Sequence, residues 1–162
     1  MRPLDLRDAE GMLEWMHDDK IAHVFAKNFS TMQLDDVKTF IKKSQVDKSA
    51  LHLAVVDDTD EYMGTISLKD IDEENRRAEY AISMRKCAHG TGLSFKATKE
   101  LLAYAFEKIR LHKVYLNVLS LNQRAIAFYK KCGFKQEGCF SDWVLRDGNY
   151  YDLLWFAAQS QN

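Results

Sequence analysis

Helical and alternating patterns of hydrophobic residues divide the chain into a succession of short elements. Asp8 is placed to cap an amphipathic helix, and a second amphipathic helix spans about Gln33 to Ser44. The apolar positions of these two helices are Met12, Leu13, Trp15, Met16, Val37, Phe40 and Ile41. Three runs rich in β-forming residues follow, separated by clusters of Asp, Glu and Asn, at residues 51–56, 62–68 and 78–84. The pattern predicts two helices that lie on an antiparallel meander.

The second half of the chain begins with the longest predicted helix. Its apolar residues recur every four positions, at Leu93, Ala97, Leu101, Ala105 and Ile109, which predicts about five turns with one apolar face. A strand at residues 114–119 follows, and then a short helix that Asn122 caps and Gly133 ends. Two last strands, residues 139–145 and 150–157, flank Asp147-Gly148, a dipeptide favoured in tight hairpins. With a very short first strand, this order predicts an α/β (α+β) fold in which helices flank a mixed sheet.

Length and composition favour one compact domain over residues 1–162. The chain has 162 residues, 46% of them hydrophobic, which suits a single core better than two full domains. Its 23 basic and 24 acidic residues give a formal net charge of -1, so no cationic field draws it to nucleic acid or to an anionic membrane. The sequence shows no membrane-length apolar run, no secretory signal and no paired cysteine spacing. We expect a cytoplasmic protein with reduced thiols.

The segment Cys87-Ala88-His89-Gly90-Thr91-Gly92 lies between a predicted strand and the longest helix. Its two glycines can expose backbone N–H groups, and the first N–H groups of the helix lack internal partners and lie at its positive end. Phosphates bind readily at such a place. The segment has neither the Gly-Lys-Ser/Thr of a P-loop nor the third glycine of a dinucleotide fingerprint. Two interpretations stay open: a pyrophosphate cradle, or an ordinary turn in which Gly90 adopts a positive φ.

Two motifs in order along the chain resemble the GNAT superfamily of N-acetyltransferases. Gly90 and Gly92 match the family's acetyl-CoA motif, Gln/Arg-x-x-Gly-x-Gly/Ala, whereas Cys87 stands where the family usually has Gln or Arg. Residues 122–134 match the family's Asn-x-x-Ala-x-x-x-Tyr-x-x-x-Gly-Phe segment at every named position. The resemblance covers nearly the whole chain. Residues 76–80 and the helix that contains Trp15 resemble the branch of ribosomal-protein alanine, polyamine and nucleotide-amino-sugar acetyltransferases.

The resemblance implies a mixed, mostly antiparallel sheet of six to seven strands, with about four helices and a splayed strand pair at the cofactor site. It also implies acetyl-CoA as the cosubstrate and direct attack of a neutral amine on the thioester. The residues that it assigns to the cofactor are Ile82, Met84, Cys87, His89, Gly90, Thr91, Gly92, Leu93 and Asn122. His89 is either a phosphate donor or a solvated loop side chain. Cys87 as an acyl-enzyme nucleophile is disfavoured because no partner base is visible.

Tyr129 is the acid that the resemblance implies. A phenol with a pKa near ~10 is neutral at neutral pH and can protonate the departing CoA thiolate. Tyr129 follows Asn122 by about two helical turns, so the two side chains can share one face near the cofactor. The alternative for Tyr129 is a core aromatic residue, and Asn122 is expected to cap the helix in either case.

Glu79 is the candidate for removal of the amine proton, acting through a water molecule. Its alternative, slightly favoured, is an ion pair with Arg76 or Arg77 at a strand edge. Some relatives carry a glutamate on the fifth strand, but Asn117 stands there in this chain and cannot act as a base. Water alone is the third possibility for this step.

Trp15 is the candidate wall of the acceptor site, because an indole can stack on a sugar or peptide plane, with core packing as its alternative. A nucleotide-linked amino sugar is the first expected acceptor and a protein N-terminus the second; a polyamine would ask for an acidic pocket. The rival function is a catalytically silent acyl-CoA-binding module, motivated by Cys87 and by the missing fifth-strand carboxylate. The five histidines lack ligand spacing, so no metal is expected. A homodimer through the terminal hairpin stays open.

Overall fold

The computed structural model describes residues 1–25 and 27–160; residues 26, 161 and 162, which the predicted domain span 1–162 includes, lie outside this description. The strands are β1 (Arg2–Pro3), β2 (Leu51–Val56), β3 (Tyr62–Asp72), β4 (Arg77–Met84), β5 (Lys113–Leu119), β6 (Lys135–Arg146) and β7 (Asn149–Gln159). The helices are α1 (Ala9–Met16), α2 (Asp19–Ala22), α3 (Leu34–Ser44), α4 (Leu93–Glu107) and α5 (Gln123–Cys132), with 3-10 turns η1 (Leu6–Asp8) and η2 (Lys86–Ala88). The short α2, η1 and η2 were not predicted, because a single turn leaves no periodic pattern.

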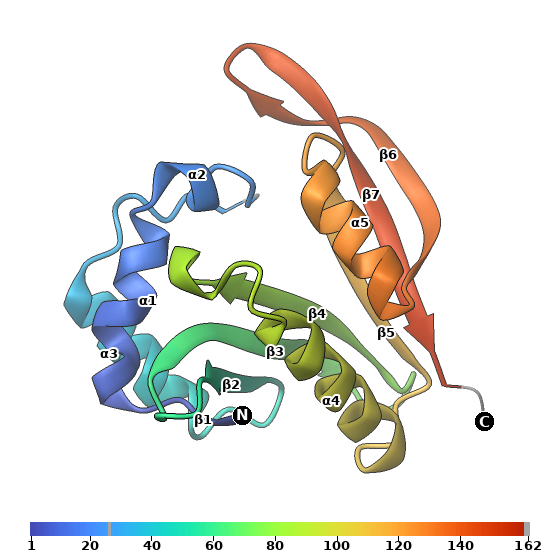
Figure 1. Ribbon diagram of the computed structural model, residues 1–162. Coiled ribbons are helices and arrows are strands. Elements are labelled where there is room, and N and C mark those ends of the chain that lie inside the picture. Colours follow the sequence, from blue (N-terminus) through green and yellow to red (C-terminus); the bar gives the residue numbers. More distant parts are fainter. Residues whose placement is uncertain (26, 161–162) are drawn as a thin grey trace.

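All seven strands join one sheet in the order β1-β2-β3-β4-β5-β7-β6 (Figure 1). Every neighbouring pair is antiparallel except β4 and β5, which run parallel because α4 crosses between them. The predicted fold class, a mixed and mostly antiparallel sheet with flanking helices, is confirmed.

Helices cover both faces of the sheet, and alternate residues of each strand supply the two cores. On β2, Ala54 packs with α1 and α3, whereas the next residue, Val55, packs on the side of α4 and α5. The α4–α5 side is the larger core and includes Leu101 and Leu116, each 1% exposed. The α1–α3 side includes Trp15 and buries a smaller set of apolar residues.

Helix α4 has 15 residues and ends at Glu107, so the prediction that it continues through Ile109 is wrong. The amides of Lys108 and Ile109 both bond to the Tyr104 carbonyl, and this closes the helix. Arg110 then adopts a φ of 65°, outside the right-handed helical region. Ile109 still packs against the larger core, which explains why it continues the apolar pattern.

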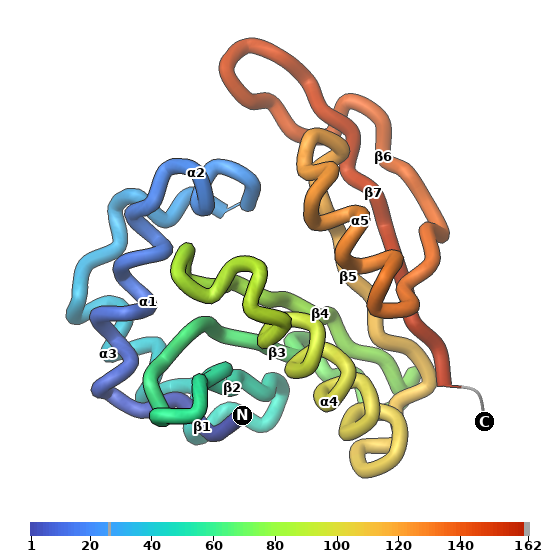
Figure 2. The backbone as a smooth tube through the Cα atoms, in the orientation of Figure 1, coloured from blue at the N-terminus to red at the C-terminus, as the bar shows by residue number. Residues whose placement is uncertain are grey.

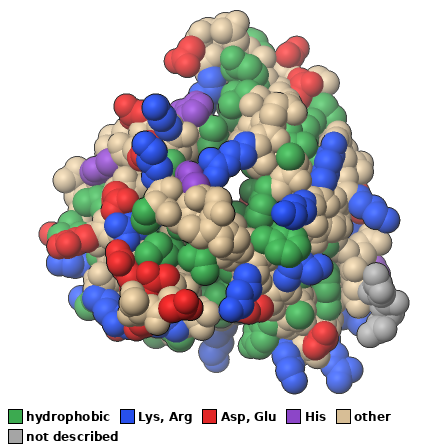
Figure 3. Space-filling model, in the orientation of Figure 1, with side chains coloured by type: hydrophobic (Ala, Val, Ile, Leu, Met, Phe, Trp, Pro, Cys, Tyr) green, Lys and Arg blue, Asp and Glu red, His purple; other side chains and the backbone are tan. Residues whose placement is uncertain are grey.

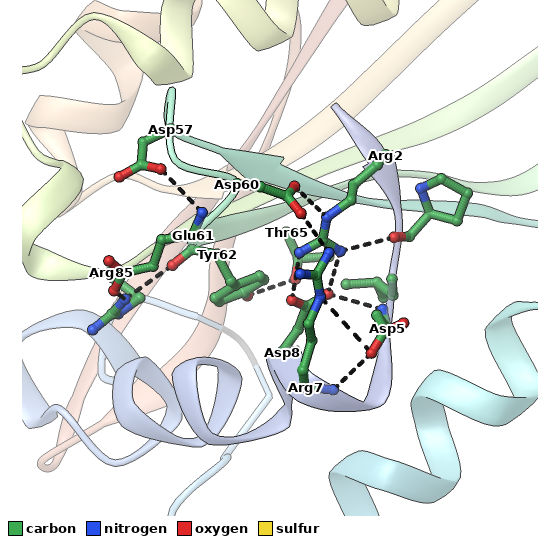
Figure 4. Close-up of polar contacts among 12 residues, drawn as sticks. Arg2, Asp5, Arg7, Asp8, Asp57, Asp60, Glu61, Tyr62, Thr65 and Arg85 are labelled. Carbon is green, nitrogen blue, oxygen red and sulfur yellow. Dashed lines mark hydrogen bonds and ion pairs between the residues drawn. The ribbon is translucent and has the colours of Figure 1, made fainter.

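The predicted capping role of Asp8 is also wrong, because its side chain is used elsewhere. Asp8 is 2% exposed, and its carboxylate accepts two bonds of 2.8 Å from the Arg2 guanidinium and one from the Asp5 amide. Arg2 also bonds to Asp60, in the turn between β2 and β3 (Figure 4). Asp5, not Asp8, caps the first turn by accepting from the Arg7 amide. The network ties the N-terminal segment to the β2–β3 hairpin.

The β6–β7 hairpin extends beyond the rest of the sheet (Figure 2). At its tip, Asp147 and Gly148 have φ values of 49° and 78°, the two positive values that a type I′ turn requires. The predicted tight hairpin is therefore confirmed, although β6 begins at Lys135, earlier than the pattern indicated. The large exposed apolar side chains of the hairpin are Phe140, Trp143, Leu145 and Tyr150.

Candidate active site

A cavity of about 950 Å³ lies where the α1–α3 segment, the strands β3 to β5 and the first turns of α5 meet. The predicted site residues that line it are Trp15, Glu79, Ile82, Met84, His89, Asn122 and Tyr129. Figure 3 shows a hollow between the end of β4 and α5, with Lys, Arg and His side chains gathered beside it. The volume is that of a typical small-molecule or cofactor site.

The cavity enters the sheet because β4 and β5 pair over a short length. Their register comprises Arg77–Lys113, Ala78–Val114 and Glu79–Tyr115. Beyond these pairs the strands diverge as they continue to Met84 and Leu119 (Figures 1 and 2). Backbone N–H and C=O groups on that edge of β4 therefore face the gap instead of a neighbouring strand. This is the splayed pair that the sequence resemblance implies, and Ile82 and Met84 lie on its wall.

The glycine turn after β4 requires glycine for its backbone shape. Gly90 and Gly92 have φ values of +81° and +84°, in the left-handed region, while a Cβ at either position would meet no atom within 4 Å. The positive φ, and not crowding, is therefore the constraint. The predicted loop residues Cys87, Gly90, Thr91, Gly92 and Leu93 do not line the cavity themselves; they form the loop to which His89 belongs. The Cys87 thiol lies 3.9 Å from the Met63 thioether, which is not a base.

The first backbone amides of helix α4 make no hydrogen bonds within the helix. The Leu93 amide lies 3.4 Å from the Thr91 hydroxyl, and the Lys96 amide makes the first bond to the Gly92 carbonyl. The amides between them, of Ser94 and Phe95, bond to no group in the part of the chain that is described. Such amides at the positive end of a 15-residue helix are a suitable place for a phosphate.

His89 joins the loop to the cavity. Its Nδ1 lies 3.2 Å from Nη1 of Arg124, in the first turn of α5, so this ring nitrogen accepts and carries no proton. Partial burial, and then the Arg124 cation, lower the pKa of His89 below its ordinary value. The contact makes His89 more than a solvated loop side chain. Arg124, which the prediction omitted although it lies in the matched motif, adds a permanent cation to the cavity wall.

Asn122 and Tyr129 both lie on α5 and line the cavity, as their spacing predicted. The Asn122 side chain accepts a bond of 3.1 Å from the Ala125 amide, so its capping role is confirmed. The Tyr129 ring packs edge-on against Tyr80 and Phe134, with both centroid distances 6.0 Å. Burial raises the pKa of Tyr129 to about 12. Its hydroxyl bonds to no described residue, so the protonated Tyr129 hydroxyl is free to donate a hydrogen bond.

Glu79 is ion-paired, but its partner is neither Arg76 nor Arg77. Its Oε1 lies 3.0 Å from Nζ of Lys69 and 3.4 Å from Nδ2 of Asn117. The predicted partners are wrong because the register of β3 and β4 places Lys69 directly opposite Glu79. Oε1 of Glu79 thus accepts hydrogen bonds from both Lys69 and Asn117.

Trp15 fits both of its interpretations. It is 4% exposed and belongs to the α1–α3 core, and it also lines the cavity. Its Nε1 donates to the Tyr62 hydroxyl at 3.1 Å, and its ring contacts Phe25 and Phe29 at centroid distances of 5.7 and 5.2 Å. These contacts fix the indole as part of the wall nearest the first helices.

The sequence-based prediction missed a pair of polar residues on the cavity wall, His52 on β2 and Ser67 on β3. The two stand directly opposite each other, and Ser67 in turn stands opposite Ala81 on β4. All three residues line the cavity. Nδ1 of His52 lies 2.7 Å from Oγ of Ser67, and the imidazole packs edge-on against Phe40. Desolvation lowers the pKa of His52. The signal was present in the alternation of β2 and β3, but only the hairpin register brings the two residues together.

The cavity wall is cationic overall. Among the described residues that line it, the one carboxylate, Glu79, is already paired with Lys69, and the remaining cations are Lys20, Lys27 and Arg124. Residues 1–25 and 27–160 contain no group of three or more His, Cys, Asp and Glu side chains arranged to hold a metal ion. Over the same residues, none of the helices has the length and apolar character needed to cross a membrane.

Known proteins resemble this chain in both sequence and structure. Residues 1–135 match the family described as the acetyltransferase (GNAT) domain. The chain is 30% identical over 160 residues to the spermidine N(1)-acetyltransferase of Escherichia coli, covering 95% of this chain and 82% of that protein. It is 32% identical over 94 residues to the putative ribosomal N-acetyltransferase YdaF of Bacillus subtilis, covering 58% and 51%.

A solved structure shares the fold over nearly the whole length. It is the crystal structure of spermidine N-acetyltransferase from Vibrio cholerae in complex with CoA and spermine, with a TM-score of 0.89, 24% identity and coverage of 98% of this chain and 93% of that one. The family match over residues 1–135 agrees with the diverging strands β4 and β5 and with the glycine turn that follows β4. The chain therefore belongs to the GNAT acetyltransferases and is an N-acetyltransferase that takes its acetyl group from acetyl-CoA.

Proposed function

We propose that this N-acetyltransferase acts on a primary amine carried by an anionic small molecule, with a nucleotide-linked amino sugar as the favoured acceptor. The observation that carries this proposal is the charge of the cavity wall, where Lys20 and Lys27 make no ion pair with any described residue. Cations near the first helices would attract a phosphorylated acceptor. Trp15, in the same wall, offers an indole edge for a sugar or base.

On the donor side, we propose that the loop from Cys87 to Leu93 holds the CoA diphosphate through its backbone amides. Arg124 on α5 contacts His89 of this loop and would add charge-assisted bonds to phosphate oxygens, and His89 would add a further bond from the loop itself. The pantetheine arm would follow the open edge of β4 past Ile82 and Met84, as an added strand does, with Asn122 on the opposite wall.

Tyr129 is the proposed acid. The neutral amine attacks the thioester carbonyl, and collapse of the tetrahedral intermediate expels the CoA thiolate. Because the pKa of Tyr129 is raised to about 12, its hydroxyl stays protonated throughout the neutral range and can give its hydrogen to the departing sulfur. The absence of a competing bond to described residues leaves this hydrogen available.

A polyamine is the second candidate acceptor, because relatives of this chain are named spermidine acetyltransferases. A polycation needs carboxylates, and the single carboxylate of the cavity wall is already bonded to Lys69 and Asn117. The physical character of the wall therefore favours the anionic acceptor. A protein N-terminus, the second acceptor expected from the sequence, is the third candidate here and is suggested by the name of the B. subtilis relative.

The test is release of CoA thiol from acetyl-CoA with three acceptors: a uridine-diphosphate-linked amino sugar, spermidine and a peptide with a free N-terminus. The amino sugar is expected to give the highest kcat/KM. Lys27→Glu should raise the KM for the amino sugar about tenfold, since one cation becomes an anion. Lys42→Glu, on the exposed face of α3 outside the cavity, is the matched control and should change nothing. Spermidine as the best substrate, improved by Lys27→Glu, would contradict the proposed acceptor class.

A homodimer and a cytoplasmic location stay predictions. The hairpin surface formed by Phe140, Trp143, Leu145 and Tyr150 supports the first, because β6 is an edge strand with large exposed apolar side chains. Sedimentation of the wild type and of Trp143→Ser over a range of concentrations would test it.

A further inference from the structure

When an amine is acetylated, the attacking nitrogen must lose a proton. Most titratable side chains of the cavity wall already take part in hydrogen bonds or ion pairs. Oε1 of Glu79 receives Lys69 and Asn117. His89 accepts from Arg124 on the proposed phosphate side. The exposed His23 bonds through Nδ1 to the carbonyl of Asp19, in its own helical turn. His52 is the remaining histidine of the wall.

His52 is held in one orientation by two contacts. Its Nδ1 lies 2.7 Å from Oγ of Ser67, and its ring packs against Phe40 at a centroid distance of 4.9 Å. When the Ser67 hydroxyl donates to Nδ1, the lone pairs of Oγ are left to accept from a second donor. Ser67 is 5% exposed, so it lies deep in the cavity wall.

The strand register carries this pair toward the open edge of β4. Ser67 stands opposite Ala81, and Ala81 precedes Ile82, which lies on the wall of the splayed gap. All three residues line the same cavity, and Ala81 contributes only a methyl group between Ser67 and the gap. An amine that entered there would have Oγ of Ser67 on one side and, under the proposed function, the thioester arm on the other.

We propose that Ser67 and His52 form a two-residue relay that takes the proton from the acceptor amine as it attacks acetyl-CoA; this role rests on the proposed function. The nitrogen gives its proton to Oγ of Ser67 while Oγ gives its own proton to Nδ1 of His52. The new C–N bond forms as the C–S bond breaks, the sulfur receives the proton of Tyr129, and the imidazolium returns its proton to solvent.

The surroundings of His52 keep it able to accept a proton. Desolvation by the packed strands and α3 is the main cause that lowers the pKa of its imidazole. Two nearby charges act on the imidazole of His52 in opposite directions. Asp47, before β2, favours the protonated imidazole, and Lys69, on β3, disfavours it. The ring is therefore neutral at pH 7, as a general base requires.

The experiment measures single-turnover acetyl transfer by His52→Gln with whichever of the three panel amines the wild type acetylates fastest. We expect a rate about 10²-fold lower, with acetyl-CoA affinity and acceptor KM unchanged. The wild-type rate should fall below pH ~6.5 as His52 gains a proton, and His52→Gln should lack this acid limb. Ser67→Ala should give a smaller loss, because a water can replace the hydroxyl.

A second variant separates a proton acceptor from a packing residue. His52→Ala leaves room for added imidazole, which should restore much of the rate; it should not restore Tyr129→Phe. His112→Gln, an exposed histidine outside the cavity, is the matched control and should behave as the wild type.

The outcomes distinguish the relay from the proposed function. An unchanged rate in His52→Gln, or a loss in His52→Ala that imidazole does not restore, overturns the relay alone. Failure of the wild type to acetylate any of the three amines overturns the proposed acceptors, and the relay with them.

Discussion

The two faces of the strands β3 to β5 are made by alternate residues of the same segments, yet they differ in kind. Toward α4 and α5, Ile66, Leu68 and Leu116 are at most 1% exposed and belong to the larger apolar core. Toward α1 and α3, the intervening residues Ser67 and Asn117 are polar and line the cavity. One face supplies stability and the other carries the polar groups of the site.

At the gap between β4 and β5, residues of the apolar face also line the cavity. Tyr129 packs on the edge of the α4–α5 core, and its hydroxyl still reaches the cavity wall because no strand pairing closes the sheet there. Tyr80, its edge-on neighbour, also lines the cavity, but its hydroxyl bonds to Oγ1 of Thr98 at 2.7 Å. Two adjacent tyrosines of one core thus differ in what their hydroxyl groups are free to do.

Replacement of Tyr129 by phenylalanine should have the largest effect. The lost acid should lower kcat by about 10²-fold or more, while the stability of the fold changes little, because the hydroxyl has no partner among the described residues. Stopped-flow detection of CoA thiol and calorimetric titration with acetyl-CoA measure the two quantities. Normal turnover in this variant would assign Tyr129 to the core alone.

Leu101→Ala should damage the apolar face without touching the chemistry. The side chain is 1% exposed on α4, so the free energy of unfolding should fall by about 2–5 kcal/mol. Urea titration measures this loss, and kcat at 15 °C, where the variant remains folded, should match the wild type. A large drop in kcat there would show that the two faces are energetically coupled.

Tyr80→Phe is the matched partner of the Tyr129 change. It removes a buried bond to Thr98 and should cost about 1 kcal/mol of stability with no loss of turnover. The opposite pattern, full stability and reduced turnover, would exchange the roles assigned to the two tyrosines.

The smallest effect concerns the pH dependence of stability. The pKa values of His52 and His89 are lowered in the folded state, so between pH ~6.5 and those lower values the unfolded chain binds more protons. Stability should therefore be complete above pH ~6.5 and fall slightly toward pH 5.5. Urea titrations at both pH values measure it, and His52→Gln should reduce the difference. A rise in stability on acidification would contradict the sign.

Local patterns were sufficient for most of the fold. The four-residue repeat from Leu93, the alternation of the meander and the Asp147-Gly148 turn each depend on near neighbours, and each predicted its element correctly. Asn122 and Gly133 marked the two ends of α5 for the same reason. Apart from the unpredicted α2, η1 and η2, the differences lie at the ends of elements, as with α4 and β6, because tertiary contacts decide where an element stops.

Pairings between distant residues could not be predicted in this way. The ion pair of Glu79 with Lys69 and the hydrogen bond of His52 with Ser67 depend on strand register. The ion pair of Asp8 with Arg2 depends on the path of the N-terminal segment. A one-residue change of register would send each strand partner to the other face. The motif match placed Tyr129 and the glycine turn, but it held no information on the acceptor-side wall.

The short pairing of β4 with β5 leaves two strand edges facing each other inside one sheet. Beyond Glu79 and Tyr115 the facing edges of the two strands do not pair with each other, and the Leu119 carbonyl accepts instead from the Asn122 amide. Other backbone groups along these edges are placed to bond to an extended ligand. Under the proposed function, the coenzyme arm would lie here as an eighth, removable strand. Binding of the arm should slow amide hydrogen exchange along both edges, and its release after each turnover should leave the two parts of the sheet joined by the three pairs from Arg77–Lys113 to Glu79–Tyr115.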